Sequence, residues 1–205
     1  MSIDPLPSTS ANGRLDGRRQ RSERTRRLII EAYLKLLPVT GTMPTAAQIA
    51  SEAGCSQRSI YERFTDLDAL NLATADYAIA QGQAEAAARH VDAERPVRIR
   101  SHVETRALAC EKWLPLWRIL LNIDKPELRQ RVALVRFANV QRLRLMYGPE
   151  LALVPDAERS ELVIALAALT SFESWDQLRH CYDLSIEAGQ AVWRGAIERL
   201  LPRAA

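Results

Sequence analysis

Residues 45–64 read TAAQIASEAGCSQRSIYERF, a pattern that predicts two short helices joined by a glycine turn. Thr45 lies three residues before Gln48, which is the spacing of a capping box, where each side chain satisfies a backbone amide of the other residue. The first helix should end at Gly54, because glycine enters the left-handed conformation without a Cβ penalty. Ser56 then provides a side-chain oxygen to cap a second helix.

The apolar positions of this segment have the spacing of a helix-turn-helix. Ala50 lies four residues before the glycine and Ile60 six residues after it. The motif needs a small residue where its helices cross and an aliphatic one to fill the angle between them. An ordinary helix pair in an all-α core would also fit. The polar residues expected to face outward from the second helix are Gln57, Arg58, Ser59, Glu62 and Arg63.

Basic charge is concentrated directly before the helix pair. Seven arginines and two acidic residues fall between Arg14 and Arg27, whereas the whole chain carries a net charge of +3. Such a run can be a solvated tail. Next to a helix-turn-helix, we expect it to contact DNA phosphates and to supply affinity and salt dependence rather than specificity.

The segment from Thr25 to Leu70 resembles the tetracycline-repressor-like (TetR) family of transcriptional regulators. The first-helix matches are Arg26, Ile29, Ile30, Ala32 and Leu36, and the helix-turn-helix matches are Thr45, Ile49, Ala50, Ala53, Gly54, Ser56, Ile60, Tyr61 and Phe64. One position departs from the family. Leu67, flanked by Asp66 and Asp68, stands where the family usually has a lysine that contacts a DNA phosphate.

The resemblance implies a homodimeric repressor that leaves a palindromic operator in double-stranded DNA when a small-molecule effector binds. The side chains expected at the DNA are Arg26, Thr45, Ser56, Gln57, Arg58, Ser59, Tyr61, Glu62 and Arg63. Arg58 has the chemistry to read guanine, Gln57 adenine and Glu62 cytosine. We expect Tyr61, Arg63 and the arginine run to replace the missing lysine.

Composition indicates a globular protein of two domains. The 205 residues are 47% hydrophobic and 26% charged, and no apolar run approaches the roughly 20 residues that span a bilayer. We predict a disordered basic tail over 1–20, a DNA-binding domain over 21–66 and an effector-binding and dimerisation domain over 67–205. A basic start followed by an apolar stretch is missing from the first 13 residues, so we expect a cytoplasmic location without membrane contact.

The chain is predicted to be all-α, with about nine helices, because sustained two-residue alternation is absent. We expect a long helix from Asp66 to about Val91 and helix starts near Pro96, Pro115 and Pro126. Two further helices are expected over about 156–182 and 185–201, separated by a short break at residues 183–184. The three cysteines, Cys55, Cys110 and Cys181, are far apart and are interpreted as free thiols, and we predict no metal and no cofactor.

Residues 162–169 are apolar around a whole helix, which predicts a second partner beyond the domain's own core. A central helix of a monomer would show the same pattern. The last two helices also resemble the dimer interface of the TetR family. The residues expected there are Leu162, Leu166, Leu169, Val192, Trp193, Ile197 and Leu200.

The resemblance also implies an effector pocket in the second domain. Aromatic residues with a few polar neighbours are suited to such a site, namely Trp113, Trp117, Arg136, Phe137, Asn139, Phe172, Glu173 and Trp175. Glu173 could neutralise a cationic ligand or pair with an arginine such as Arg179.

Two other functions remain open at this point: an all-α enzyme, and an interaction module that has lost its DNA. An H-E-x-x-H motif, a Walker-type loop, a nucleophile elbow and a di-iron carboxylate set are all missing from the sequence, so we predict no enzyme.

Overall fold

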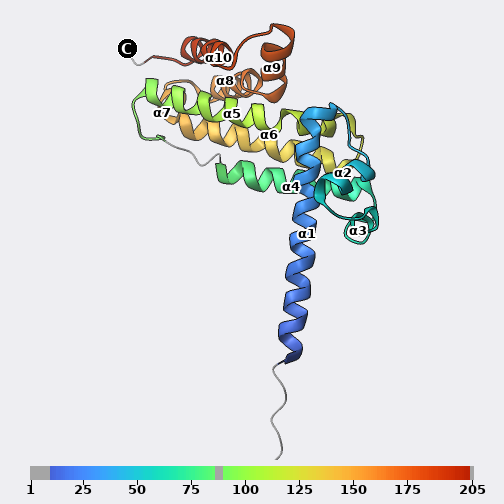
Figure 1. Cartoon of the computed structure of the whole chain (residues 1–205). Coiled ribbons are helices and arrows are strands. Elements are labelled where there is room, and N and C mark those ends of the chain that lie inside the picture. Colours follow the sequence, from blue (N-terminus) through green and yellow to red (C-terminus); the bar gives the residue numbers. More distant parts are fainter. Residues whose placement is uncertain (1–9, 86–89, 204–205) are drawn as a thin grey trace, which may run out of the picture. The chain divides into compact units, whose positions relative to one another are not determined.

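The structure, a computed structural model, describes residues 10–85 and 90–203, and the side chains from residue 19 onward. Its described residues form helices and no β-strand, which confirms the all-α prediction (Figure 1). The helices are α1 Ser10–Thr40, α2 Ala46–Ala53, α3 Gln57–Tyr61, α4 Leu67–Glu85, α5 Arg95–Asn122, α6 Pro126–Met146, α7 Gly148–Leu151, α8 Asp156–Leu169, α9 Phe172–Asp176, the π-helix η1 Gln177–Cys181 and α10 Ile186–Leu200. In the described residues, none of these helices is long and apolar enough to cross a membrane.

The chain divides into two compact units, residues 1–74 and 75–205, so the division lies inside α4. The sequence placed it at residue 66, before that helix. The first turns of α4 belong to the first unit because Leu70 is fully buried there and Asn71 accepts a 2.6 Å hydrogen bond from the Tyr33 hydroxyl.

Helix α1 begins at Ser10, inside the range 1–20 for which we expected disorder. Residues 1–9 lie outside the described part of the chain. Helix formation from Ser10 onward is consistent with composition, because the segment that follows is rich in arginine and proline-free as far as Pro38. The long helix expected from Asp66 to about Val91 is described from Leu67 to Glu85.

Proline positions predicted two of three helix starts in the second unit. Helix α5 starts at Arg95 with Pro96 in its first turn, and α6 starts at Pro126. The start expected at Pro115 is wrong, because α5 continues through that residue to Asn122. Buried side chains on both sides of the proline, Leu114 and Leu116 among them, hold this helix against the core despite the lost backbone hydrogen bond.

The helix expected over about 156–182 is interrupted. Helix α8 ends at Leu169, where the Thr170 hydroxyl donates to the Leu166 carbonyl, and Ser171 caps α9 by accepting from the Ser174 amide. The final helix, α10, agrees with the expected range and is capped by Ser185. Helices α5, α6, α8 and α10 pack together around the core of the second unit (Figure 1).

A polar cluster is buried in this core. Arg98 and Glu150 form an ion pair in which both side chains are less than a tenth exposed. Arg98 also donates through Nε to the Met146 carbonyl at 2.9 Å, at the end of α6. His102 Nδ1 lies 2.7 Å from the Tyr147 hydroxyl. These contacts fix α5 to α6 and α7.

The buried His102 predicts an acid-sensitive core. Burial, followed by the charges of Arg106 and Arg142, lowers the pKa of His102 from 6.5 to about 3. Below pH 6.5 the unfolded chain therefore binds a proton that the folded chain does not. Because of this difference, the free energy of unfolding should fall as the pH decreases from about 6.5 toward about 3, by up to about 1.4 kcal/mol per pH unit.

Urea unfolding at pH 7 and pH 5 measures this loss, which we expect to reach about 2 kcal/mol for this residue. Tryptophan fluorescence is a suitable signal, since all four tryptophans lie in the second unit. The variant His102→Gln should lose that part of the pH dependence. An equal pH dependence in the variant would assign the effect to other groups.

Candidate nucleic-acid interface and ligand cavity

The start of α2 has the predicted capping box. The Gln48 amide donates to the Thr45 hydroxyl at 3.3 Å, and the Thr45 amide donates to Gln48 Oε1 at 2.8 Å. Helix α2 ends at Gly54, which has a φ of 63° in the left-handed region. Ser56 then caps α3 by accepting from the Ser59 amide at 3.1 Å. The turn is therefore fixed by local hydrogen bonds that the sequence spacing predicts.

Buried apolar contacts set the angle between α2 and α3. Ala50 is 4% exposed and Ile60 is fully buried, as a close helix crossing requires. Phe64, which follows α3, is also buried, and the guanidinium of Arg26 lies 4.8 Å above the centre of its ring. Arg26 therefore ties α1 to the end of the motif through a cation–π contact, in addition to any role at DNA.

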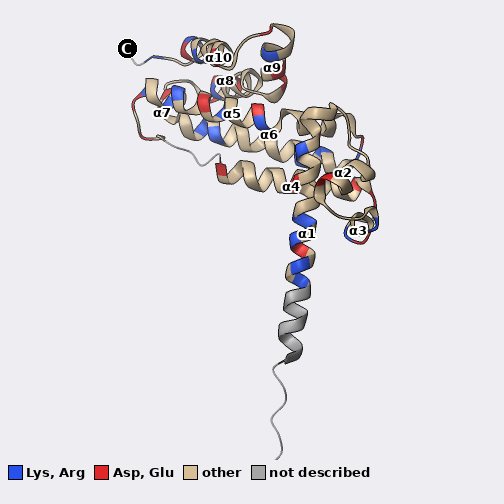
Figure 2. Cartoon of the chain, in the orientation of Figure 1, with Lys and Arg blue, Asp and Glu red and all other residues tan. Residues whose placement is uncertain are grey.

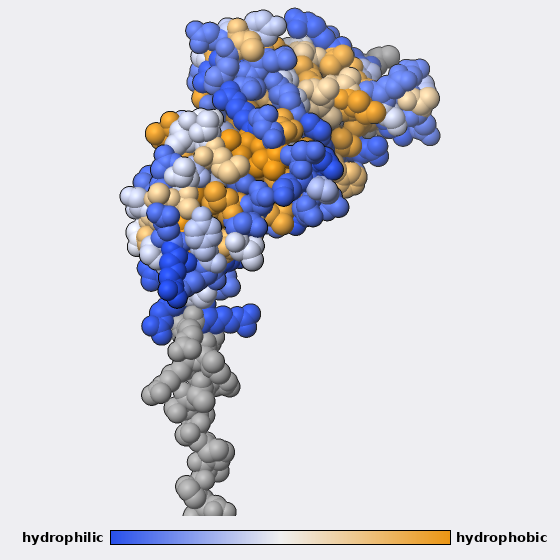
Figure 3. Space-filling model, turned by 90° about the vertical axis from the view of Figure 1, so that its right-hand side faces the viewer, coloured by the Kyte–Doolittle hydropathy of each residue, from blue (hydrophilic) through white to orange (hydrophobic). Residues whose placement is uncertain are grey.

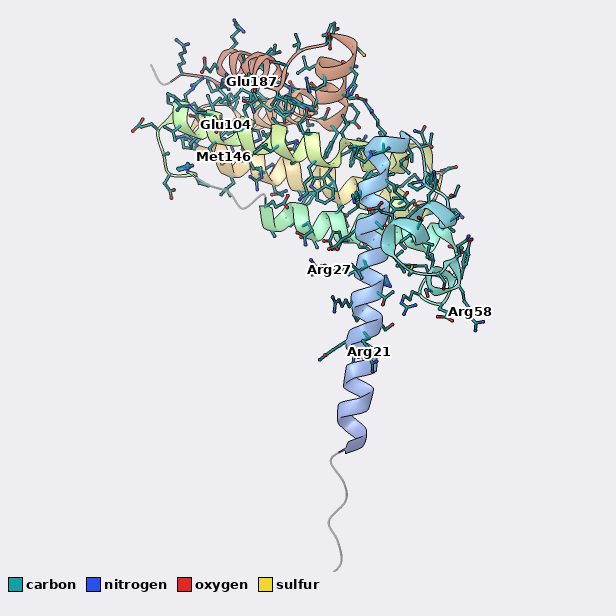
Figure 4. The ribbon with its side chains drawn as sticks, viewed as in Figure 1. Arg21, Arg27, Arg58, Glu104, Met146 and Glu187 are labelled. Carbon is teal, nitrogen blue, oxygen red and sulfur yellow. The ribbon has the colours of Figure 1, made fainter. Side chains whose placement is uncertain are left out.

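The first side chains of α3 are exposed to solvent. Gln57 and Arg58 are exposed, and Arg58 projects away from the helix (Figure 4). Arg58 donates to Glu62 at 3.0 Å, but the pair is open to solvent and contributes little to stability. Ser59 is half-buried, and its hydroxyl lies 3.0 Å from that of Ser56.

Arg63 is placed differently from our expectation. Its side chain is 20% exposed and its Nη1 donates to the Ser59 carbonyl at 2.9 Å, so it lies along α3 instead of pointing outward. The reason is that the long side chain covers its own helix end, where a carbonyl is in reach. Tyr61, by contrast, is 51% exposed and remains available to a DNA backbone.

Leucine occupies the position that usually holds lysine in the TetR family. Leu67 is half-buried at the start of α4. The preceding Asp66 caps this helix by accepting from the Ala69 amide at 2.7 Å. Asp66 thus supplies helix stability at a place where the family supplies a phosphate contact.

Arginines along α1 provide basic charge in the same unit (Figure 2). Arg19, Arg21, Arg24 and Arg27 are exposed, while Arg26 is half-buried against Phe64. The described residues of α1 next to the grey segment are strongly hydrophilic in Figure 3. The side chains of Arg14 and Arg18 lie outside the described residues.

The second unit contains a cavity of about 390 Å³ lined by α4, α5 and α6 and by Phe172 of α9. Four of the residues predicted for an effector pocket line it: Trp113, Trp117, Asn139 and Phe172. Trp117 and Phe172 stack with their ring centres 4.7 Å apart. The remaining wall is largely aliphatic, with Leu116 and Leu120 beside the two tryptophans.

The other four predicted pocket residues lie outside the cavity. Phe137 is 62% exposed, and Trp175 is fully buried in the core against Trp193. Arg136 donates to Glu173 at 2.8 Å, so the carboxylate is neutralised by this arginine. Arg179, the other partner we considered for it, is bound to Glu111 at 2.7 Å instead.

Sequence reasoning missed three charged residues of the cavity, Arg106, Arg131 and Arg142. A signal was present for the first of them. Arg106 lies seven residues before Trp113, so both side chains fall on one face of a helix. Arg142 lies in a segment with many arginines, and its spacing did not distinguish it from its solvent-exposed neighbours.

The predicted dimer residues divide into two groups. Leu166, Trp193 and Ile197 are fully buried in the core of the second unit, so these three do not offer a surface to a partner. Leu162 and Leu169 are half-buried, while Val192 and Leu200 are 45% and 44% exposed. The most exposed large apolar side chain of α8 is Ile164, which is 65% exposed and was not among the residues we predicted.

The sequence and the structure were compared with known proteins. No protein-family model matches the sequence, and no curated protein matches it. The structure is similar to that of a Rhodococcus sp. protein described as a TetR-family transcriptional regulator, with a TM-score of 0.66 and 17% identity over 87% of this chain and 100% of that one.

Two further solved structures are similar. The multidrug binding protein EbrR, in complex with imidazole, has a TM-score of 0.64 and 19% identity over 89% of this chain and 92% of its own. NalD, the secondary repressor of the MexAB-OprM multidrug efflux pump in Pseudomonas aeruginosa, has a TM-score of 0.52 and 20% identity over 89% of this chain and 98% of its own. The chain therefore has the TetR-family fold.

Proposed function

We propose that this protein is a DNA-binding transcriptional regulator of the TetR family. The observation that carries the proposal is the first unit, in which a glycine-broken helix pair exposes Gln57 and Arg58 beside an arginine-lined helix. Arginine and glutamine at the start of such a helix match the edges of guanine and adenine in the major groove. The protein would act in the cytoplasm, on double-stranded DNA.

The arginines of α1 would supply the electrostatic part of this binding. We expect Arg19→Ala, Arg21→Ala and Arg24→Ala together to weaken binding to all DNA sequences and to lower the salt slope by about one per lost phosphate contact. Alanine favours helix, so α1 should persist. Fluorescence anisotropy at several salt concentrations measures the slope.

A matched control removes three exposed arginines from the second unit, Arg129, Arg144 and Arg199. The net charge change is the same, but the salt slope should stay at its original value. If both triple variants changed the slope equally, overall charge and not the basic helix would be responsible.

The regulator is proposed to act as a homodimer that binds a palindromic operator. Exposed apolar side chains on α8 and α10, including Ile164, Val192 and Leu200, would form the face that a second copy covers. A two-fold pair would set two recognition helices about one DNA turn, roughly 34 Å, apart.

Light scattering tests the dimer directly. Ile164→Glu should halve the molecular mass in solution, because it places a carboxylate in an apolar contact. Val39→Glu, at an 83% exposed site in the first unit, should leave the mass unchanged. An unaltered mass in the first variant would contradict this choice of interface.

Effector control is proposed to come from the cavity of the second unit. Its apolar wall with a few polar groups is suited to a small molecule, and one protein with a similar fold is known as a multidrug binding protein and another as a repressor. A ligand that favours the DNA-free state would release the operator, and DNA would weaken that ligand by the same factor.

Protection of an inverted repeat near the protein's own coding region is the deciding experiment. Purified protein should protect such a repeat from nuclease cleavage and bind it tightly, with strong salt dependence. An interaction module or an enzyme, the two alternative functions, would show only weak binding without sequence preference. That result would contradict the proposal.

A further inference from the structure

The charge inside the cavity of the second unit has one sign. Among the described residues, three arginines line it, Arg106, Arg131 and Arg142, whereas no aspartate or glutamate does. Arg131 is neutralised by Asp76, to which it donates two hydrogen bonds of 2.9 and 3.3 Å. The charge balance therefore depends on the other two arginines.

Arg106 and Arg142 have no carboxylate partner in the described part of the chain. Arg106 donates through Nε to the Thr170 carbonyl at 2.7 Å, and its guanidinium lies 4.5 Å from the centre of the Phe172 ring. This fixes its position but leaves its charge unbalanced. Burial, and then the charge of Arg106, lower the pKa of Arg142. The two cations therefore repel each other at the cavity.

Two buried polar atoms of the cavity wall also lack a partner among the described residues. Trp113 and Asn139 are 9% and 8% exposed, and Trp113 Nε1 and Asn139 Oδ1 make no hydrogen bond. The Asn139 amide nitrogen is used, since it donates to the Thr170 hydroxyl at 3.4 Å. Leaving buried polar atoms unpaired is costly, so these two indicate a polar ligand group.

We propose that the ligand of this cavity is an amphipathic anion, with a carboxylate between Arg106 and Arg142 and an apolar ring or chain against Trp113, Trp117 and Phe172. Arginine binds carboxylates through paired hydrogen bonds, which accounts for two otherwise unbalanced cations at an apolar site. A ligand hydroxyl or carbonyl would meet Asn139 and Trp113. The proposal rests on the proposed function, because it names the chemical class of the effector.

A cationic ligand fits this site poorly. Glu173, which sequence reasoning considered as its counter-ion, lies outside the cavity and is paired with Arg136. A cation would therefore approach two arginines, with no acidic side chain among the wall residues that the structure describes. Like charges in a partly desolvated site repel strongly.

Calorimetric titration of the full chain, without DNA, tests the proposal. The probes are benzoate, 2-naphthoate and decanoate, with 2-naphthamide and 2-naphthylmethylamine as neutral and cationic counterparts. We expect at least one carboxylate to bind, and 2-naphthoate to bind at least tenfold more tightly than either counterpart. Failure of all three carboxylates at millimolar concentration, or tighter binding of the amine, would overturn the proposal.

Variants locate the anion. Arg142→Met should weaken carboxylate binding at least tenfold, and Arg142→Lys, which keeps the charge, should restore part of it. Arg129→Met, an exposed position on the same helix, should have no effect. Equal affinity in Arg142→Met and the unaltered protein would contradict the assigned position.

DNA binding is measured separately on the ligand-free protein. Retained operator protection without carboxylate binding would reject the anionic ligand and leave the proposed function in place. Carboxylate binding without operator protection would reject the regulator and leave the anion site in place.

Discussion

Glu150→Ala should lower the free energy of unfolding of the second unit by about 3 to 5 kcal/mol, because it leaves the Arg98 guanidinium buried without its counter-charge. Both side chains of this ion pair are less than a tenth exposed, so water cannot replace the missing carboxylate. The other arginine contacts, to the Met146 and Ala93 carbonyls, remain but do not balance the charge. Urea unfolding followed by tryptophan fluorescence measures the loss.

Two further variants separate charge from packing. The double variant Arg98→Met and Glu150→Leu should recover most of the stability, since apolar residues of similar size often replace a buried ion pair without loss. Arg129→Met, which removes an exposed ion pair with Asp124, should change the free energy of unfolding by less than about 1 kcal/mol. A small effect of Glu150→Ala, close to that of Arg129→Met, would show that the buried pair is not needed.

Gln57→Ala combined with Arg58→Ala should remove sequence preference with little change in stability. Each good side chain–base pair is worth about 1 to 3 kcal/mol of discrimination, so operator binding should weaken by at least about 2 kcal/mol per subunit. Stability should change little because both side chains are exposed, and the side-chain contact that the described residues would lose is the solvent-open pair of Arg58 with Glu62. Competition between operator and unrelated DNA measures the preference.

The control is the double variant Arg129→Ala and Gln130→Ala, which removes the same side-chain types from two adjacent exposed positions of α6. It should leave the ratio of specific to non-specific affinity unchanged. If the Gln57 and Arg58 variant lowered both affinities equally, these residues would serve the DNA backbone and not the bases.

Local hydrogen bonding explains which parts of the fold the sequence predicts well. The capping box at Thr45, the left-handed Gly54 and the Ser56 cap all depend on residues within three or four positions of one another. Their geometry is therefore encoded in spacing alone. The same holds for the helix starts at Pro96 and Pro126.

Contacts between distant residues account for the features that the sequence did not predict. Pro115 stays inside a helix because its buried neighbours pack against other helices. Arg63 is a local exception, because its guanidinium turns back to the Ser59 carbonyl only four residues earlier. The apolar composition of α8 could not show which side meets its own core. Leu166 is inside and Ile164 outside, although both are apolar and two positions apart.

The sequence predicted some of the cavity residues and missed others. Trp113 and Trp117 were found because large aromatic side chains are rare and conspicuous in this chain. Arg142 was missed because the sequence contains many arginines, and only the folded structure shows which of them lack a carboxylate. Whether an arginine has a carboxylate partner depends on its three-dimensional surroundings and cannot be predicted from the spacing of residues in the sequence.

In α2 and α3, the residues that stabilise the motif differ from the residues that face solvent, and this separation affects how such a protein can evolve. The residues that build the motif, Ala50, Gly54 and Ile60, point inward or set the turn, whereas Gln57 and Arg58 face solvent and bond at most to a neighbour on their own helix. Under the proposed function, a substitution at the outer positions would therefore change the DNA sequence that is bound at almost no cost in folding. The DNA specificity of such a protein could then evolve while its helix-turn-helix framework stays the same.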